Sequence, residues 1–77
     1  MIVKVLQEHI DNGKPSKPES CPLALAAKAQ YGSANIGVGS GTIGGKEYKF
    51  PPPVSWWISS FDSGATIYPI EIELPDV

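Results

Sequence analysis

The sequence predicts an α+β domain of the ferredoxin-like (βαββαβ) kind, with two helices on one face of an antiparallel sheet. Two segments indicate the helices. Residues 54–61 carry apolar side chains at positions i, i+3, i+4 and i+7, and residues 23–31 form an alanine-rich run that a glycine ends. Around them lie short stretches of alternating apolar and polar residues, which are typical of half-buried strands.

The first half of the chain supplies one strand and one helix. The apolar, β-rich run Ile2–Leu6 predicts the strand, and residues 7–13 predict a single helical turn that a glycine stops. A capping hydroxyl at Ser20, followed by a proline in the first turn, predicts where the helix begins. Helical spacing gives its buried face as Pro22, Leu25, Ala26 and Ala29.

The second half supplies the other three strands and a second helix. Residues 34–38 alternate as a strand, and the pair Gly44-Gly45 leaves open whether residues 42–50 form one strand or a small additional hairpin. The proline run 51–53 ends this stretch and begins the helix. The core-facing residues of that helix are Val54, Trp57, Ile58 and Phe61, and residues 70–74 form a last strand with an acidic outer face.

Size and charge narrow the function classes. Residues 1–77 make a single domain, and a domain this small hides only about 60% of its unfolded surface, so we expect a thin core and self-association as a homo-oligomer. The net charge is -2 and the chain has no arginine, whereas polynucleotide binders present a dense basic surface. We therefore expect no polynucleotide partner, and no apolar stretch is long enough for a membrane span.

Cysteine and histidine usage argues against catalysis and metal binding. A lone cysteine, Cys21, excludes an internal disulfide, and together with His9 it supplies too few soft ligands for a structural zinc site. Cys21 near a helix start could be nucleophilic with His9 as its base, but no orienting third group is evident. We therefore expect a non-enzymatic protein with no catalytic residues, no cofactor and no metal. The N-terminus lacks a signal-peptide pattern, so we also expect the protein to be cytoplasmic.

Trp56 is the most informative residue for function. It lies on the side of the second helix opposite the apolar face, among serines, so we expect it to be partly exposed. Exposed aromatic residues mark protein interfaces and stacking surfaces for ligands. A covering loop is the alternative interpretation.

The loop before the first long helix is the second candidate site. Lys14, Ser16 and Lys17 lie beside a helix start, where free N–H groups and the helix dipole favour phosphate. His9 precedes this loop in a polar turn, and we include it among the candidate ligand-binding residues. A solvated linker is the alternative interpretation of the lysines.

Two further patterns have structural explanations. The glycines of residues 37–41 resemble a dinucleotide-binding motif, but β structure and not a helix follows them, so they predict a hairpin. Glu71 and Glu73 share one side of a strand, which a solvated outer face explains as well as acid–base chemistry does.

Several segments together are similar to a family of short proteins encoded by bacteriophages and some bacteria. They are residues 7–13 (QEHIDNG), 21–26 (CPLALA), 50–52 (FPP) and 61–62 (FD). The resemblance covers most of the chain and supplies no catalytic residues. It implies a phage protein that acts against host defence in the host cell cytoplasm.

These observations lead to two functional expectations. In the first, a homo-oligomer sequesters a small anionic signalling nucleotide, with Lys14, Ser16 and Lys17 on phosphate and Trp56 stacking or joining the copies, because one thin domain can hardly enclose a ligand. In the second, the protein inhibits a host defence protein by direct contact, with Trp56 as the anchor.

Overall fold

A computed structural model describes residues 1–37 and 39–74. The elements it contains, in chain order, are β1 (Ile2–Val5), α1 (Gln7–Asn12), α2 (Pro22–Tyr31), β2 (Ala34–Ile36), β3 (Ser40–Ile43), β4 (Lys46–Lys49), α3 (Pro52–Asp62) and β5 (Ile70–Glu73). The predicted α+β class is confirmed. Val38, which the sequence places in the second strand, lies outside the described residues.

The described strands form two antiparallel sheets. β2, β3 and β4 make one sheet in that order, and β1 pairs with β5 in a two-stranded ribbon. The single sheet of the ferredoxin-like prediction is not found, and that topology is not confirmed. The reason lies partly in the turn at Gly44 and Gly45, whose φ angles of 59° and 85° suit a tight hairpin turn, so residues 42–50 split between β3 and β4.

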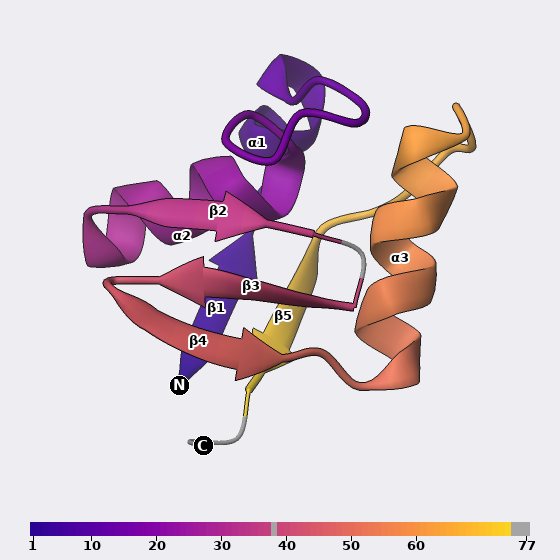
Figure 1. The fold of residues 1–77 in the computed structure, drawn as a ribbon. Helices are drawn as coiled ribbons and strands as arrows, with labels where there is room; N and C mark the ends of the chain where they lie inside the picture. The colour runs from indigo at the N-terminus through magenta and orange to yellow at the C-terminus, as the bar shows by residue number, and fades with distance from the viewer. Residues whose placement is uncertain (38, 75–77) are drawn as a thin grey trace.

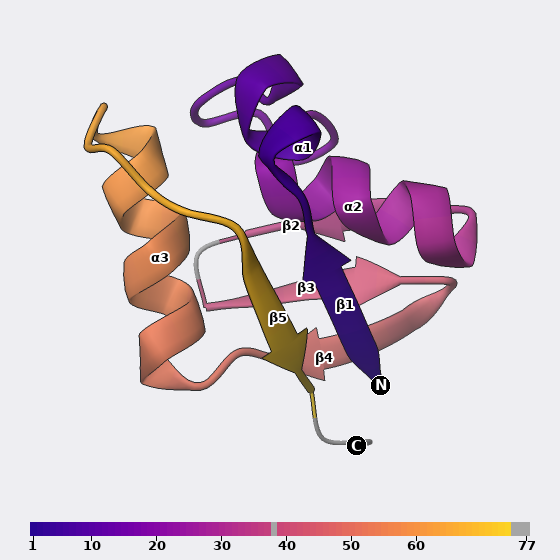
Figure 2. The ribbon, with the colours of Figure 1, turned by 180° about the vertical axis from the view of Figure 1, so that it is seen from behind.

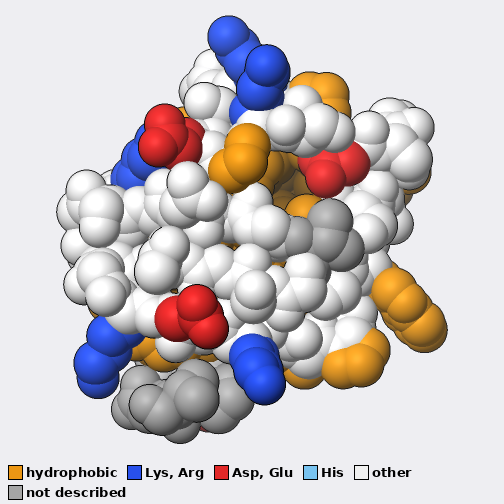
Figure 3. All heavy atoms as spheres, in the orientation of Figure 1, with side chains coloured by type: hydrophobic (Ala, Val, Ile, Leu, Met, Phe, Trp, Pro, Cys, Tyr) orange, Lys and Arg blue, Asp and Glu red, His pale blue; other side chains and the backbone are white. Residues whose placement is uncertain are grey.

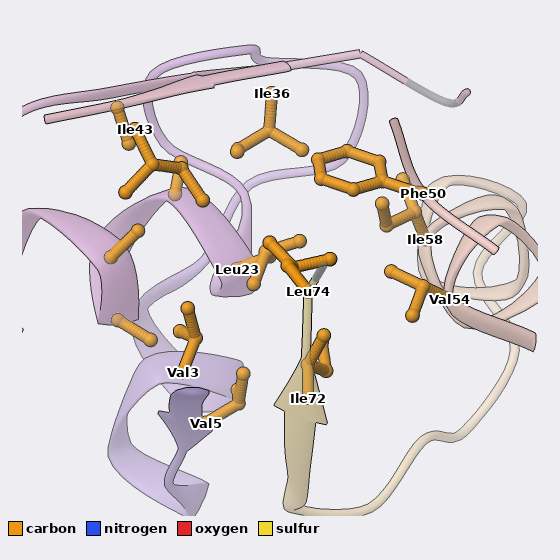
Figure 4. Close-up of a cluster of buried hydrophobic side chains, with 14 of the residues drawn as sticks. Val3, Val5, Leu23, Ile36, Ile43, Phe50, Val54, Ile58, Ile72 and Leu74 are labelled. Atoms are coloured by element: carbon orange, nitrogen blue, oxygen red, sulfur yellow. The ribbon is translucent and has the colours of Figure 1, made fainter. Parts of the chain in front are cut away.

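The two sheets face each other across one core. Figures 1 and 2 show the three-stranded sheet on one side and the β1–β5 ribbon on the other, with α2 and α3 at opposite ends of the space between them. Side chains from both sheets and both helices point into this space (Figure 4). The most completely buried large ones are Val3, Val5, Pro22, Leu23, Ile43 and Leu74.

The start and the buried face of α2 differ from the sequence prediction. The capping residue is Cys21 and not Ser20, because the Cys21 Sγ accepts a hydrogen bond from the Ala24 N–H at 3.4 Å. The buried residues are Pro22, Leu23, Ala24, Ala26 and Ala27, while Leu25 is half-buried and Ala29 is exposed. The cause is that α2 packs against β1, β2 and α1 at once, so its buried arc is wider than a single stripe.

Candidate functional site: a groove beside α3

α3 turns one tryptophan inward and the next one outward. Val54 and Ile58 are buried in the core, and Trp57 packs against that core while half-buried. Trp56, one residue earlier, is 73% exposed. The predicted exposure of Trp56 is therefore confirmed, and no loop of the described chain covers it.

The segment after α3 returns along the same helix. Gly64 has a φ of 88°, and the Ala65 N–H donates to the Ser60 carbonyl at 2.9 Å, which reverses the chain at the end of α3. The Trp57 Nε1–H donates to the carbonyl of Tyr68 at 3.1 Å. This bond fixes the segment against α3, and Tyr68 is 71% exposed.

Trp56 and Tyr68 belong to one groove, which we call the α3 groove. It has a volume of about 340 Å³ and is lined by Pro53, Trp56, Trp57, Ser60, the segment 65–68 and Ile70. None of these residues carries a charge, and the only side-chain hydroxyls besides that of Tyr68 belong to Ser60 and Thr66. In Figure 3, hydrophobic side chains stand out at the lower right, beside the start of α3. Such a surface binds by apolar and aromatic contact.

The sequence did not single out Tyr68. Residues 65–69 have no clear periodicity, so the sequence predicts no helix or strand there. In the structure Ile67 is buried and the next residue, Tyr68, is exposed. A single alternation of this kind is too short to predict a strand from the sequence.

The loop that carries Lys14, Ser16 and Lys17, which we call the lysine loop, lies beside a different hollow. That hollow has a volume of about 240 Å³ and is lined by Ser16, Lys17, Pro18, Cys21, Ile36, Gly37, Ile58 and Asp62. Figure 3 shows it with lysine side chains above and an acidic side chain on its rim. Lys14 is exposed and does not line it, and neither hollow includes His9. The predicted ligand-binding residues are therefore not brought together around one cavity.

The contacts of this second hollow oppose phosphate binding. Asp62 contributes a carboxylate, and its Oδ1 accepts a hydrogen bond from the Ser16 N–H at 2.8 Å. At the start of α2, Pro22 has no N–H and the N–H of Ala24 is already bonded to the Cys21 sulfur. Few free N–H groups remain there for an anion, and a fixed negative charge faces the same space.

Cys21 and His9 do not form a nucleophile–base pair. Cys21 is 4% exposed, and burial raises the pKa of its thiol above the ordinary value, although hydrogen bonds from backbone N–H groups partly oppose that rise. His9 Nδ1 instead accepts the Leu6 N–H at 2.9 Å, which closes the first turn of α1. Within residues 1–37 and 39–74, no hydrogen bond joins the two side chains.

The remaining sequence patterns have structural explanations. Ile36 pairs with Gly41, so the glycine-rich stretch joins two antiparallel strands as predicted. Glu71 and Glu73 are both exposed on the outer face of β5. In the described part of the chain, no cluster of three or more His, Cys, Asp or Glu side chains could hold a metal ion. No helix there has the length and apolar character needed to cross a membrane.

Comparisons of the chain with protein-family models, with curated proteins and with solved structures gave no match.

Proposed function

We propose that this protein is a non-enzymatic binding protein that holds a protein partner on the α3 groove. The observation that carries the proposal is that Trp56 and Tyr68, the two most exposed large hydrophobic residues of the described chain, line one uncharged groove. Exposed aromatic residues beside a depression are typical anchors of protein interfaces, where truncation of one anchor costs at least about 2 kcal/mol of binding free energy. In the setting that the family resemblance implies, the partner is a host defence protein, which the contact inhibits.

The proposal is tested with the immobilised protein and a lysate of the host. We expect a host protein that the wild type retains and that a Trp56→Ala/Tyr68→Ala variant does not. Leu6→Ala is the matched control, because Leu6 is a large hydrophobic residue, 50% exposed, that lies outside the groove. Equal retention by the groove variant and the control would show that the groove is not the contact surface.

Sequestration of a small anionic nucleotide by a homo-oligomer is the second candidate function. Lys17 and Ser16 on the rim of the second hollow favour it, whereas the carboxylate of Asp62 there opposes it. A nucleotide held tightly by the folded protein raises its melting temperature by mass action. A thermal-shift panel of cyclic dinucleotides and ADP-ribose derivatives, with gel filtration and light scattering for the number of subunits, tests this candidate. No shift with any member would exclude it in favour of the protein partner.

A further inference from the structure

The outward peptide groups of the β1–β5 ribbon define its two edges. The backbones of Met1 and Leu74 exchange two hydrogen bonds, of 3.0 and 2.8 Å. In an antiparallel pair, bonded positions alternate, so the next bonded pairs along the register are Val3 with Ile72 and Val5 with Ile70. The peptide groups that point away from the ribbon are therefore those of Ile2 and Lys4 on one edge and of Glu71 and Glu73 on the other.

The β1 edge is closed by side chains of α2. Gln30 bonds both outward groups of Lys4: its Oε1 accepts the N–H at 3.2 Å, and its Nε2 donates to the carbonyl at 2.9 Å. The Tyr31 hydroxyl donates to the carbonyl of Ile2 at 2.6 Å. These side chains replace a neighbouring strand, so no further strand can pair along β1 without displacing them.

The β5 edge is open in the described structure. Within residues 1–37 and 39–74, the outward N–H and C=O groups of Glu71 and Glu73 make no hydrogen bond. Figure 2 shows no strand along the side of β5 that faces away from β1. An edge of this kind is a template for an added strand.

The open edge continues into the α3 groove. Ile70 begins β5 and also lines the groove, and the segment 65–68 just before it forms one wall while α3 forms the other. A strand added to β5 would therefore extend between these two walls. Its alternate side chains would enter the groove beside Trp56 and Trp57.

The charges along this edge select the occupant. Two copies of β5 paired antiparallel about Ile72 would place Glu71 opposite Glu73, and like charges in directly opposed positions destabilise a sheet. Lys4 lies opposite Glu71 on β1, whereas Glu73 lies opposite the uncharged Ile2. The outer face thus keeps a net negative charge, which disfavours a second copy and favours a strand with lysine or arginine.

We propose that the open edge of β5 accepts an extended, basic segment of a partner protein as a third strand, with apolar residues of that segment in the α3 groove. This inference rests on the proposed function and specifies the kind of partner. Main-chain hydrogen bonds to Glu71 and Glu73 provide the affinity, and the groove and the acidic outer face provide the selectivity.

The probe is an end-capped, eight-residue peptide that alternates valine and lysine, added to isotope-labelled protein and followed by NMR. We expect shifts concentrated at residues 66–73 and amide hydrogen exchange slowed about tenfold at Glu71 and Glu73, the equivalent of one additional hydrogen bond. A peptide that alternates valine and glutamate should cause neither effect. Absence of slowed exchange at these two amides with the lysine peptide would overturn the inference.

Charge reversal separates selectivity from general electrostatic attraction. Glu71→Lys/Glu73→Lys should exchange the preference, so that the glutamate peptide binds and the lysine peptide does not. Glu8→Lys/Glu47→Lys changes the net charge by the same amount at exposed positions on α1 and β4 and should keep the original preference. An equal loss in both variants would mean that net charge alone governs binding, and strand addition would be rejected.

The two proposals fail in different ways. If a host protein is retained through Trp56 but the lysine peptide does not protect Glu71 and Glu73, then the groove binds a partner without strand addition. If the peptide protects these amides equally in the wild type and in Trp56→Ala, and no host protein depends on Trp56, then the edge binds while the proposed function is wrong.

Discussion

The two adjacent tryptophans of α3 provide a matched test of the structure. Trp56→Ala and Trp57→Ala remove the same side chain from neighbouring positions of one helix. Trp56 is 73% exposed, whereas Trp57 packs against the core and donates to the Tyr68 carbonyl. We expect Trp56→Ala to weaken partner binding, and Trp57→Ala to destabilise the fold more than Trp56→Ala does.

The size of the difference follows from burial. Trp56 buries 27% of its surface (100% minus the 73% that is exposed). For a tryptophan of roughly 250 Å² this is about 70 Å², and about 25 cal/mol per Å² gives an upper bound of about 1.7 kcal/mol. A Trp→Ala substitution at a fully buried position lowers the free energy of unfolding by about 3–5 kcal/mol. Trp57 is half-buried and makes one hydrogen bond, so Trp57→Ala should lower it by about 2–3 kcal/mol.

The assay is urea unfolding followed by circular dichroism, with tryptophan fluorescence as a second reading. Each variant retains one indole, so Trp56 in the Trp57→Ala protein should emit at longer wavelength and be quenched more easily than Trp57 in the other. If Trp56→Ala lowered the free energy of unfolding as much as Trp57→Ala, the outward placement of Trp56 would be refuted.

Three further predictions concern the core, the closed edge and the thiol. Leu23→Ala removes a fully buried side chain of α2 and should cost about 2–5 kcal/mol in urea unfolding. Gln30→Ala leaves the outward peptide groups of Lys4 to water, so the exchange of the Lys4 amide should accelerate about tenfold with a loss of about 1 kcal/mol. Burial raises the pKa of Cys21, so the thiol ionises first in the unfolded state; the contribution of Cys21 to stability should be constant below about pH 8.5 and decline above it. Cys21→Ala should remove this component of the decline, and the native thiol should react slowly with a disulfide reagent.

The elements of the fold could be predicted where a local signal dictates them. The glycine pair at 44–45 left a hairpin open as one of two interpretations, and the structure has that hairpin, with positive φ at both glycines. The separation of β1 and β5 into a ribbon apart from β2, β3 and β4 could not be predicted, because alternation within a strand says nothing about its partners. The closure of the β1 edge was equally hidden, because Gln30 and Tyr31 appear in the sequence as ordinary residues of a helix.

The candidate site, too, was predictable only where a local pattern in the sequence indicates it. Helical periodicity placed Trp56 outside the apolar face, and the structure exposes it. The other half of the groove depends on the return of the segment 65–69 along α3, which a tertiary hydrogen bond from Trp57 fixes. The separation of the lysines from Trp56 also depends on a tertiary contact. The Ser16 N–H donates to Asp62 at the C-terminal end of α3, and this bond holds the loop there.

The separation of the two hollows decides what a nucleotide would require. Trp56 and Ser60 line one side of α3, while Ile58 and Asp62 line the hollow on its other side. One copy therefore cannot stack a base on Trp56 and contact phosphate through Lys17 in the same cavity.

Sequestration would need the lysine loop of one copy beside the α3 groove of another. In that case Trp56→Ala and Lys14→Ala/Lys17→Ala should each lose nucleotide-dependent thermal stabilisation, whereas a mixture of the two should recover part of it through sites with both intact halves. A protein partner needs only the groove and the β5 edge of a single copy. Failure of the mixture to recover any stabilisation, with the wild type responding, would show that the nucleotide site does not combine the two hollows across copies.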